Sequence, residues 1–269
     1  MDKRIYLCLA HMSGKEMGFI QEAFDTNWVV PLGPNVSGFE QDLEAFVGEN
    51  KHVVALSAGT AAVHLALVAC GVGQGDEVMV QSFTFCASSH PMTYLGATPV
   101  FVDSEGDTWN MDPQLLEAAI KDRIAKTGKK PKAIVPVYLY GMPAKLDEIM
   151  AVAEKYGIPV IEDAAEGFGS RYKGRVCGTF GKYGVLSFNG NKMITTSGGG
   201  ALICPDAEAK KEVMFYATQA REAYPYYQHE KIGYNYRMSN ICAGIGRGQM
   251  TVVDEHIAHH KHLCGLYRE

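Results

Sequence analysis

Short apolar runs alternate with stretches of helical periodicity from residue 53 to residue 221. The apolar runs, each of strand length, lie at 53–56, 77–80, 99–102, 133–137, 159–161, 183–188 and 201–204. Helices are expected at 61–67, 113–126, 145–156 and 206–221. This alternation favours an α/β fold with a mostly parallel sheet that helices cover on both faces. Ligands of such sheets bind beyond the carboxyl ends of the strands, so the functional residues are expected there.

The two ends of the chain show helical patterns without intervening strands. Residues 15–24 and 36–47 are amphipathic, and the loop between them contains Trp28. Residues 239–267 are predicted to form one continuous helix that reaches the end of the chain without a capping signal. We therefore expect a large domain over residues 1–240 and a long helix over 241–269. That helix would lead into a C-terminal domain that is largely missing from this sequence.

Composition narrows the class of protein. The chain has 269 residues, of which 47% are hydrophobic, so it can bury a substantial core. The formal net charge of −5 comes from interspersed charges, which makes nucleic acid an unexpected partner. The seven cysteines form no C-x-x-C pair, as is typical of reduced thiols in the cytoplasm. Neither a signal peptide nor an apolar run of about 18 residues is evident, so a cytoplasmic protein without a membrane partner is expected.

Lys192 stands out among the charged residues because of its neighbours. It lies in the run SFNGNKMITTSGGG, residues 187–200, among small and polar residues and directly after a predicted strand. Partial desolvation of a lysine on such a loop favours the neutral amine, which is the nucleophile of Schiff-base chemistry. A solvated lysine on a glycine-rich turn is the alternative, and this stretch alone does not separate the two.

A second candidate is the strand-turn-helix at residues 57–62, SAGTAA. Small residues let the backbone approach an anion closely, and the N-terminus of a helix offers N–H donors and a positive dipole. With the hydroxyl of Thr60, this arrangement would suit a phosphate, although simple helix capping by Ser57 or Thr60 is the alternative. The similar run GVGQG at 71–75 precedes a strand instead of opening a helix, so it is interpreted as a turn and not as a dinucleotide site.

Acidic residues follow the apolar run 159–161 in the sequence EDAAE, residues 162–166. Asp163 could keep the ring nitrogen of an electron-sink cofactor such as pyridoxal phosphate protonated. Metal binding and general acid–base catalysis are alternatives, but no histidine at metal-ligand spacing accompanies the acids, and no metal site is predicted. Phe85, after another predicted strand, could stack on a flat ring or be an ordinary buried aromatic.

Four histidines lie on the predicted C-terminal helix, at positions 256, 259, 260 and 262. His256 and His260 are one helical turn apart. A zinc site needs three or four protein ligands in a closed geometry, and nothing nearby supplies a clear fourth. We therefore interpret the cluster as part of a solvent-exposed helix face.

In collinear order over nearly the whole chain, these motifs resemble the DegT/DnrJ/EryC family of sugar-nucleotide aminotransferases. The matching stretches are 28–39, 57–67, 82–87, 138–141, 162–165, 187–192, 195–200 and 233–237. The resemblance implies the aspartate-aminotransferase-like fold (fold type I) and pyridoxal 5'-phosphate as cofactor. Residues 187–200 and 218–222 most resemble the branch that aminates UDP-4-keto-6-deoxy-N-acetylglucosamine for bacillosamine-type sugars.

The resemblance also implies roles at the cofactor ring. Lys192 would bind the cofactor as a Schiff base and then move protons between the cofactor and the substrate. Asp163 would pair with the pyridine nitrogen, and Phe85 would stack on the ring. Glu166 would contact the phenolic oxygen, where many members carry Gln. Tyr138 stands where many members have His, and its role is left open.

Further residues are implied to hold the phosphate. Gly59, Thr60 and Ser187 would bind it within one subunit, and Asn235 would reach the phosphate of the neighbouring subunit's cofactor. A homodimer with shared active sites is therefore expected, with L-glutamate as amino donor and a nucleotide sugar as acceptor.

The sequence leaves two alternatives to a transaminase, a sugar dehydratase and a cofactor-binding remnant. Related sugar dehydratases have His in place of the lysine, so Lys192 argues against that reaction. Family members usually continue for roughly a hundred further residues, about the size of a small domain. A cofactor-binding remnant without catalysis is thus the alternative from another class, and turnover would separate it from the transaminase.

Overall fold

The structure, a computed structural model, describes Arg4, Tyr6 and residues 8–269. The stretch in which no signal peptide is predicted lies partly outside the described residues. One central sheet runs in the order β3-β2-β4-β5-β8-β9-β1, because two bridges, Ile134 with Val160 and Val137 with Asp163, join β4 to β5. The strands are β1 (His52–Leu56), β2 (Glu77–Gln81), β3 (Thr98–Val102), β4 (Ala133–Val135), β5 (Ile161–Asp163), β8 (Tyr183–Ser187) and β9 (Gly200–Cys204). A small antiparallel hairpin, β6 (Arg171–Tyr172) and β7 (Arg175–Val176), lies outside this sheet.

The sheet is mostly parallel, as predicted. The pairs β2–β3, β2–β4 and β5–β8 are parallel, whereas β9 is antiparallel to both β8 and β1. The antiparallel strand was not predicted. The chain between β8 and β9 contains no helix, and a parallel return usually crosses over through one. The same short connection carries Lys192.

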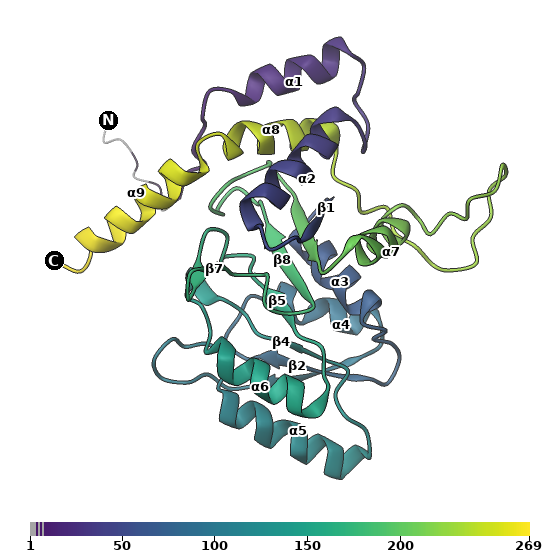
Figure 1. Ribbon diagram of the computed structural model, residues 1–269, viewed down its shortest axis with the longest axis vertical. Helices are drawn as coiled ribbons and strands as arrows, with labels where there is room; N and C mark the ends of the chain where they lie inside the picture. The colour runs from purple at the N-terminus through teal and green to yellow at the C-terminus, as the bar shows by residue number, and fades with distance from the viewer. Residues whose placement is uncertain (1–3, 5, 7) are drawn as a thin grey trace.

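Helices cover both faces of the sheet (Figure 1). One face packs against α2 (Pro34–Val47), α5 (Pro113–Thr127), α6 (Leu146–Tyr156) and α8 (Asn240–Met250). The other face packs against α3 (Gly59–Ala69), the short helix α4 (His90–Tyr94) and α7 (Ala207–Ala217). The remaining helices are α1 (Glu16–Asp25) and α9 (Val253–Leu266).

Strand β1 shows how the sequence builds this two-sided core. Its apolar residues are all fully buried, with Val53 and Ala55 in the cluster on one face and Val54 and Leu56 in the cluster on the other. A strand that is buried on both faces needs a continuous apolar run instead of alternation. This is the signal on which the strand prediction depended.

The prediction of one continuous C-terminal helix is wrong. The chain forms α8 and α9 instead, and Val252 between them has φ −127° and ψ 12°, outside the helical region. Thr251 and Val252 are both β-branched, which weakens a helix at that point. Helix α8 is rich in glycine because it packs closely: a Cβ at Gly246 would lie 2.7 Å from the Phe39 ring.

The prediction of a fully solvent-exposed histidine face is wrong for His256. Its side chain is buried, with the ring 4.1 Å from that of His11 and Nδ1 3.4 Å from the carbonyl oxygen of Met193. His259, His260 and His262 are exposed. The break before α9 therefore brings the first turn of this helix against the loop that carries Lys192. None of the helices that the structure describes is long and apolar enough to cross a membrane.

Tyr138 is fully buried in the core cluster on one face of the sheet, and its hydroxyl donates to Glu162. Glu162 is also fully buried and accepts hydrogen bonds from the backbone N–H groups of Gly178 (2.8 Å) and Gly181. Burial raises the pKa of Glu162, whereas the hydrogen bonds from Tyr138, Gly181 and Gly178 act in the opposite direction. Tyr138 thus satisfies a buried carboxyl group, which gives this position a structural role.

Replacing Tyr138 with Phe is expected to lower the free energy of unfolding by about 1.5–3 kcal/mol, because a buried carboxyl group loses one donor. Urea denaturation followed by circular dichroism would measure it. Tyr183→Phe is the control, since Tyr183 is also buried and its hydroxyl forms no hydrogen bond within the described part of the chain. Equal loss of stability in both variants would contradict a special role for the Tyr138 hydroxyl.

Candidate active site

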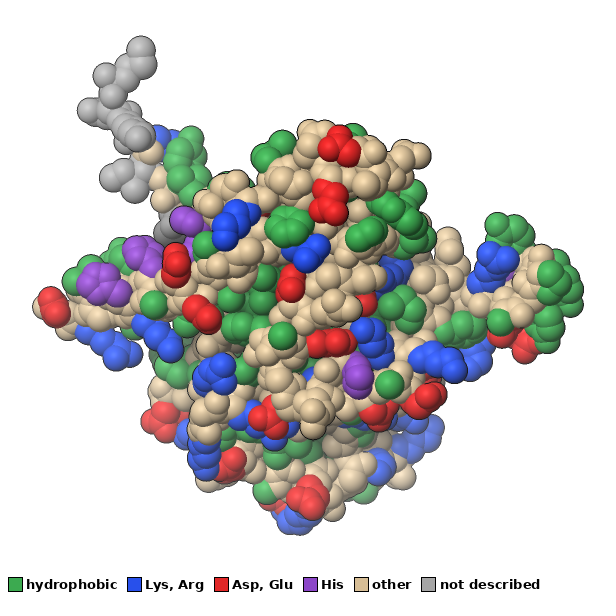
Figure 2. Space-filling model, turned by 45° about the horizontal axis from the view of Figure 1, so that its top comes forward, with side chains coloured by type: hydrophobic (Ala, Val, Ile, Leu, Met, Phe, Trp, Pro, Cys, Tyr) green, Lys and Arg blue, Asp and Glu red, His purple; other side chains and the backbone are tan. Residues whose placement is uncertain are grey.

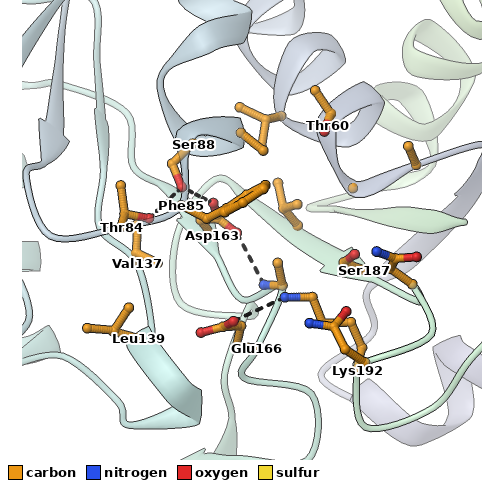
Figure 3. A pocket seen from close by; sticks show the side chains of 18 of the residues that line it. Thr60, Thr84, Phe85, Ser88, Val137, Leu139, Asp163, Glu166, Ser187 and Lys192 are labelled. Atoms are coloured by element: carbon orange, nitrogen blue, oxygen red, sulfur yellow. Dashed lines mark hydrogen bonds and ion pairs between the residues drawn. The ribbon is translucent and has the colours of Figure 1, made fainter. Parts of the chain in front are cut away.

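A cavity of about 580 Å³ opens at the carboxyl ends of the strands. The segments after β1, β2, β4, β5 and β8 all line it, together with the residues just before the antiparallel strand β9. Seven of the eight predicted site residues line this cavity, namely Gly59, Thr60, Phe85, Asp163, Glu166, Ser187 and Lys192. The location at the carboxyl edge of the sheet is as predicted, and all of these residues except Gly59 are labelled in Figure 3.

Asp163, the last residue of β5, lies at the bottom of the cavity and is buried. Its Oδ2 accepts a 2.6 Å hydrogen bond from the hydroxyl of Ser88, and its Oδ1 accepts one of 3.2 Å from the N–H of Ala165. Ser88 in turn lies 2.8 Å from the hydroxyl of Thr84. Burial raises the pKa of Asp163, while the Ser88 hydrogen bond, the Ala165 N–H and the charge of Lys192 oppose this effect. Asp163 is therefore a buried carboxyl group held in one orientation.

Lys192 forms an ion pair with Glu166 at the side of the cavity. The distance from Nζ to Oε1 is 3.1 Å, and the other carboxylate oxygen, Oε2, accepts a 2.7 Å hydrogen bond from the N–H of Tyr140 (Figure 3). Tyr140 has φ 51°, in the left-handed region that a bulky residue rarely adopts. The carbonyl of the following Gly141 is fixed by the Ser170 hydroxyl at 2.6 Å. The strained turn thus directs the backbone N–H of Tyr140 toward Glu166. Both carboxylate oxygens of Glu166 therefore have a partner, Lys192 for Oε1 and Tyr140 for Oε2.

The N-terminus of α3 forms a cradle of backbone at another part of the cavity. A Cβ at Gly59 would lie 2.9 Å from the Cβ of Ser187, and one at Gly200 would lie 2.4 Å from the N atom of Gly59. Only glycine therefore fits at these two positions. Thr60 and Ser187 line the same part of the cavity, so their hydroxyls add two hydrogen-bonding groups to the free N–H groups at the start of the helix. Such a terminus binds an anion such as phosphate without a basic side chain.

Phe85 is 73% exposed, which is unusual for a large aromatic side chain. It extends into the cavity next to Asp163 in Figure 3. One short segment, residues 84–88, thus supplies both an aromatic face and the serine that orients Asp163. The site has the donor set that pyridoxal phosphate requires: an amine, a carboxylate for the ring nitrogen, an aromatic face and a phosphate cradle.

Asn235 is the predicted site residue that does not line the cavity. It is exposed, and it lies between Tyr234 and Tyr236, whose rings stack at 5.1 Å and pack around the buried His64. The carbonyl of Tyr236 accepts a 2.8 Å hydrogen bond from the N–H of Ser57. The segment is therefore attached to the cavity wall, whereas Asn235 itself is presented on the outside.

Sequence reasoning missed three contributors, Thr84, Ser88 and the backbone amide of Tyr140. The predicted motif that contains Phe85 ends at residue 87. The signal that could have identified Ser88 is a serine three residues after Phe85. The short helix η1 (Cys86–Ser88) turns the chain after Phe85, which places Ser88 near the same site. The left-handed conformation of Tyr140 has no comparable signal, since tyrosine does not favour it.

A model of the DegT/DnrJ/EryC1/StrS aminotransferase family matches residues 11–269. The chain belongs to this family. It is 51% identical over 268 residues to the putative pyridoxal phosphate-dependent aminotransferase EpsN of Bacillus subtilis, covering 100% of this chain and 69% of EpsN. It is 40% identical over 266 residues to the GDP-perosamine synthase of Caulobacter vibrioides, covering 99% of this chain and 70% of that synthase.

A solved structure supports the fold. The DegT/DnrJ/EryC1/StrS aminotransferase of Brucella abortus superposes with a TM-score of 0.85 at 34% identity, covering 90% of this chain and 64% of that protein. The chain thus spans somewhat under two thirds of that structure. The predicted family, the aspartate-aminotransferase-like fold and, at the level of the family, pyridoxal phosphate as cofactor are confirmed. The roles of individual residues stay predictions.

Proposed function

We propose that this protein transfers an amino group from L-glutamate to a keto-sugar nucleotide with pyridoxal phosphate as cofactor. The observation that carries the proposal is the placement of Lys192 and Asp163 in one cavity beside the phosphate cradle of α3. A dehydratase is disfavoured by the lysine, as noted above.

Each part of the cavity has a task in this proposal. Bound pyridoxal phosphate supplies an electron sink that makes the substrate C–H bond acidic. Asp163 holds a proton on the ring nitrogen, and the cradle of Gly59, Thr60 and Ser187 binds the phosphate. Lys192 would hold the cofactor covalently, and its amine would accept and donate the proton at the substrate carbon. Phe85 orients the ring by stacking and excludes water from it.

The sugar substrate is proposed from motif similarity. Residues 187–200 and 218–222 favour UDP-4-keto-6-deoxy-N-acetylglucosamine, whose amination gives a 4-amino sugar for surface glycans or glycoproteins. The name of the Caulobacter relative points instead to a GDP-linked sugar for that protein. A cytoplasmic location, where nucleotide sugars are made, stays a prediction.

A homodimer with shared active sites is part of the proposal. The loop between α7 and α8 projects from the body (Figure 1), and hydrophobic side chains gather at its end (Figure 2). Tyr224, Tyr226, Tyr227 and Ile232 on this loop are exposed. An exposed apolar group of this kind favours burial against a second copy, which would also bring Asn235 to the partner's cavity.

Subunit mixing tests the shared site. Lys192→Ala and Asn235→Ala homodimers should each have little activity, while their mixture should recover up to about a quarter of wild-type activity, since one site in half of the subunit pairs is intact. Absence of recovery, with exchange of subunits shown by mass spectrometry, would mean that Asn235 acts within its own subunit.

The half-reaction tests the function itself. Absorbance of the protein with pyridoxal phosphate should show the band of the lysine-bound cofactor, and L-glutamate should convert it to that of the amine form. UDP-4-keto-6-deoxy-N-acetylglucosamine should then restore the first band. A band that glutamate does not change would mean a cofactor-binding protein without donor chemistry, and a band restored only by other keto-sugars would change the substrate.

Replacing Glu166 with Gln is expected to lower the midpoint of the pH titration of the bound cofactor's absorbance. A carboxylate beside the phenolic oxygen favours a bound proton, and a neutral amide does not. Tyr140→Phe is the control, because the contact to Glu166 comes from the backbone amide. Identical midpoints in wild type and Glu166→Gln would show that Glu166 does not face the phenolic oxygen.

A further inference from the structure

A second, smaller cavity of about 300 Å³ adjoins the first at the outer end of the sheet. It is lined by Phe83, Asp103, Ser104, Glu105, Gly106 and Trp109. Phe83 lines both cavities, so a molecule bound in the first can extend into the second.

Two buried amide side chains hold its walls. Nε2 of Gln81 donates to the carbonyl of Phe83 at 2.8 Å and to Oδ1 of Asn110 at 3.2 Å. Nδ2 of Asn110 donates to the carbonyl of Met142 at 2.8 Å, on the loop beside the first cavity. Both amides are fully buried, so the loops that carry Phe83 and Trp109 are fixed to the main site.

The two aromatic residues of this cavity are exposed without an evident structural reason. Phe83 is 45% and Trp109 62% exposed, with ring centroids 6.0 Å apart and planes at 55°. Trp109 also has φ 62°, a strained conformation for a large side chain. Exposed rings held in this way offer a surface on which a flat ligand can stack.

Asp103 and Ser104 are the polar residues of this cavity that a ligand can use, Asp103 as a hydrogen-bond acceptor and Ser104 as a donor. Oδ1 of Asp103 accepts from the N–H of Ser104 at 2.8 Å and from the Ser82 hydroxyl at 3.4 Å, which leaves Oδ2 to accept from a ligand. The Ser104 hydroxyl is buried and has no partner among the described residues. Ser104 itself lines the cavity, and its hydroxyl can take three staggered χ1 positions, so we assign it the role of donor to a ligand there.

Glu105, by contrast, is occupied. Its carboxylate accepts from the N–H groups of Asp107 and Thr108 and pairs with Lys145 at 2.9 Å. Burial opposes ionisation of Glu105, but hydrogen bonds from Thr108 and Lys145 outweigh it and lower the pKa of Glu105 to about 2. Asp103 is therefore the carboxylate that a ligand would meet.

We propose that this cavity binds the nucleobase of the sugar nucleotide and selects bases with an imide edge, an N–H beside a C=O. Asp103 accepts from the ring N–H, Ser104 donates to the carbonyl, and the base stacks on Trp109. Uracil, thymine and guanine have this edge, whereas adenine and cytosine present an unprotonated ring nitrogen there. The inference rests on the proposed function, because it assumes a nucleotide-linked substrate.

The charge of the cavity fits a base better than a phosphate. Among the residues that the structure describes, no lysine or arginine lines it, so the diphosphate of the substrate would lie outside it. A neutral ring is tolerated beside Asp103, and its N–H gains a charge-assisted hydrogen bond there.

Tryptophan fluorescence can test the inference without turnover. The chain has two tryptophans, Trp28 and Trp109, so a Trp28→Phe protein reports on Trp109 alone. We expect UDP and GDP to quench this emission at concentrations at least about tenfold lower than CDP and ADP, since one charge-assisted hydrogen bond separates them. Equilibrium dialysis of the unmodified protein with labelled UDP and CDP gives the same comparison if the Trp28→Phe protein does not fold.

The Asp103→Asn variant should lose this preference, and Asp107→Asn should keep it. The two variants change the same type of residue on one loop, but Asp107 does not line the cavity. Three results would overturn the inference. All four nucleotides could quench equally, pyrophosphate without a nucleoside could quench as well as the nucleotides, or Asp103→Asn could keep the preference.

The proposed function can fail independently of this result. Base-selective binding with no response to glutamate would refute the transaminase and leave the cavity assignment intact. A complete half-reaction together with equal binding of all four nucleotides would support the transaminase and refute the cavity assignment.

Discussion

Replacing Lys192 with Ala is expected to abolish covalent capture of pyridoxal phosphate and to lower transamination at least about 10³-fold. The lysine has two tasks in the proposal, attachment of the cofactor and proton transfer, and proton transfer by a positioned group alone contributes about 10²–10⁴-fold. Lys192 is also the one lysine that lines the cavity, so no other side chain of the described chain can substitute for it there. Absorbance and borohydride trapping followed by mass spectrometry would measure the loss.

Two controls make this experiment specific. Lys182→Ala removes an exposed lysine that does not line the cavity and should leave both measurements unchanged. A primary amine added to Lys192→Ala should restore part of the proton transfer, because the cavity around the missing side chain is otherwise complete. Covalent capture that persists in Lys192→Ala would assign the attachment to another residue.

The sequence predicted those parts of the fold that rest on local pattern. Continuous apolar runs such as 53–56 correspond to strands buried on both faces, and the residues after them meet at one edge because parallel strands end there. This geometric rule is why Asp163 and Lys192, some 30 residues apart, could be expected in one cavity. The orientation of β9 depends on whether the connection from β8 contains a crossover helix, which the apolar periodicity of the strands does not report.

What the sequence did not reveal depends on long-range contacts. The burial of His256 against Met193 requires the break between α8 and α9, where β-branched residues and close glycine packing outweigh the helical pattern. Tyr138 has no local feature that would place it on the buried Glu162. The second cavity arises because Gln81 and Asn110, far apart in the chain, pair beneath it. Such pairings are decided by packing and not by local propensity.

Replacing Asp163 with Asn is expected to lower transamination by roughly 10²–10⁴-fold, the range typical of a group that controls a proton. An amide cannot hold the ring nitrogen protonated, so the electron sink weakens. The buried position adds to the effect, because no water can take over the role of the carboxylate. The measurement is the rate of the glutamate half-reaction, with cofactor binding measured separately to show that the protein is loaded. A loaded Asp163→Asn protein with an undiminished rate would remove Asp163 from the proposed mechanism.

Replacing Ser88 with Ala is expected to have a smaller effect, through the pKa of Asp163, and to weaken cofactor binding. Loss of the 2.6 Å hydrogen bond removes a group that opposes the burial-induced rise in the pKa of Asp163, so this pKa rises further. Since Asp163 acts when ionised, the acid limb of the pH profile of cofactor affinity should move to higher pH. Affinity at neutral pH should fall roughly 10–100-fold, as for one hydrogen bond to a charged group. Ser88→Thr should retain the wild-type profile.

Ser89→Ala provides the matched control. Ser89 is the next residue, is also buried, and donates only to the nearby carbonyl of Cys86 at 3.2 Å. If Ser88 merely stabilises its short helix, both alanine variants should lose similar affinity with no movement of the acid limb. A shift confined to Ser88→Ala would show that the segment after β2 sets the charge of Asp163 as well as the position of Phe85, which joins two tasks of the cofactor site in five consecutive residues.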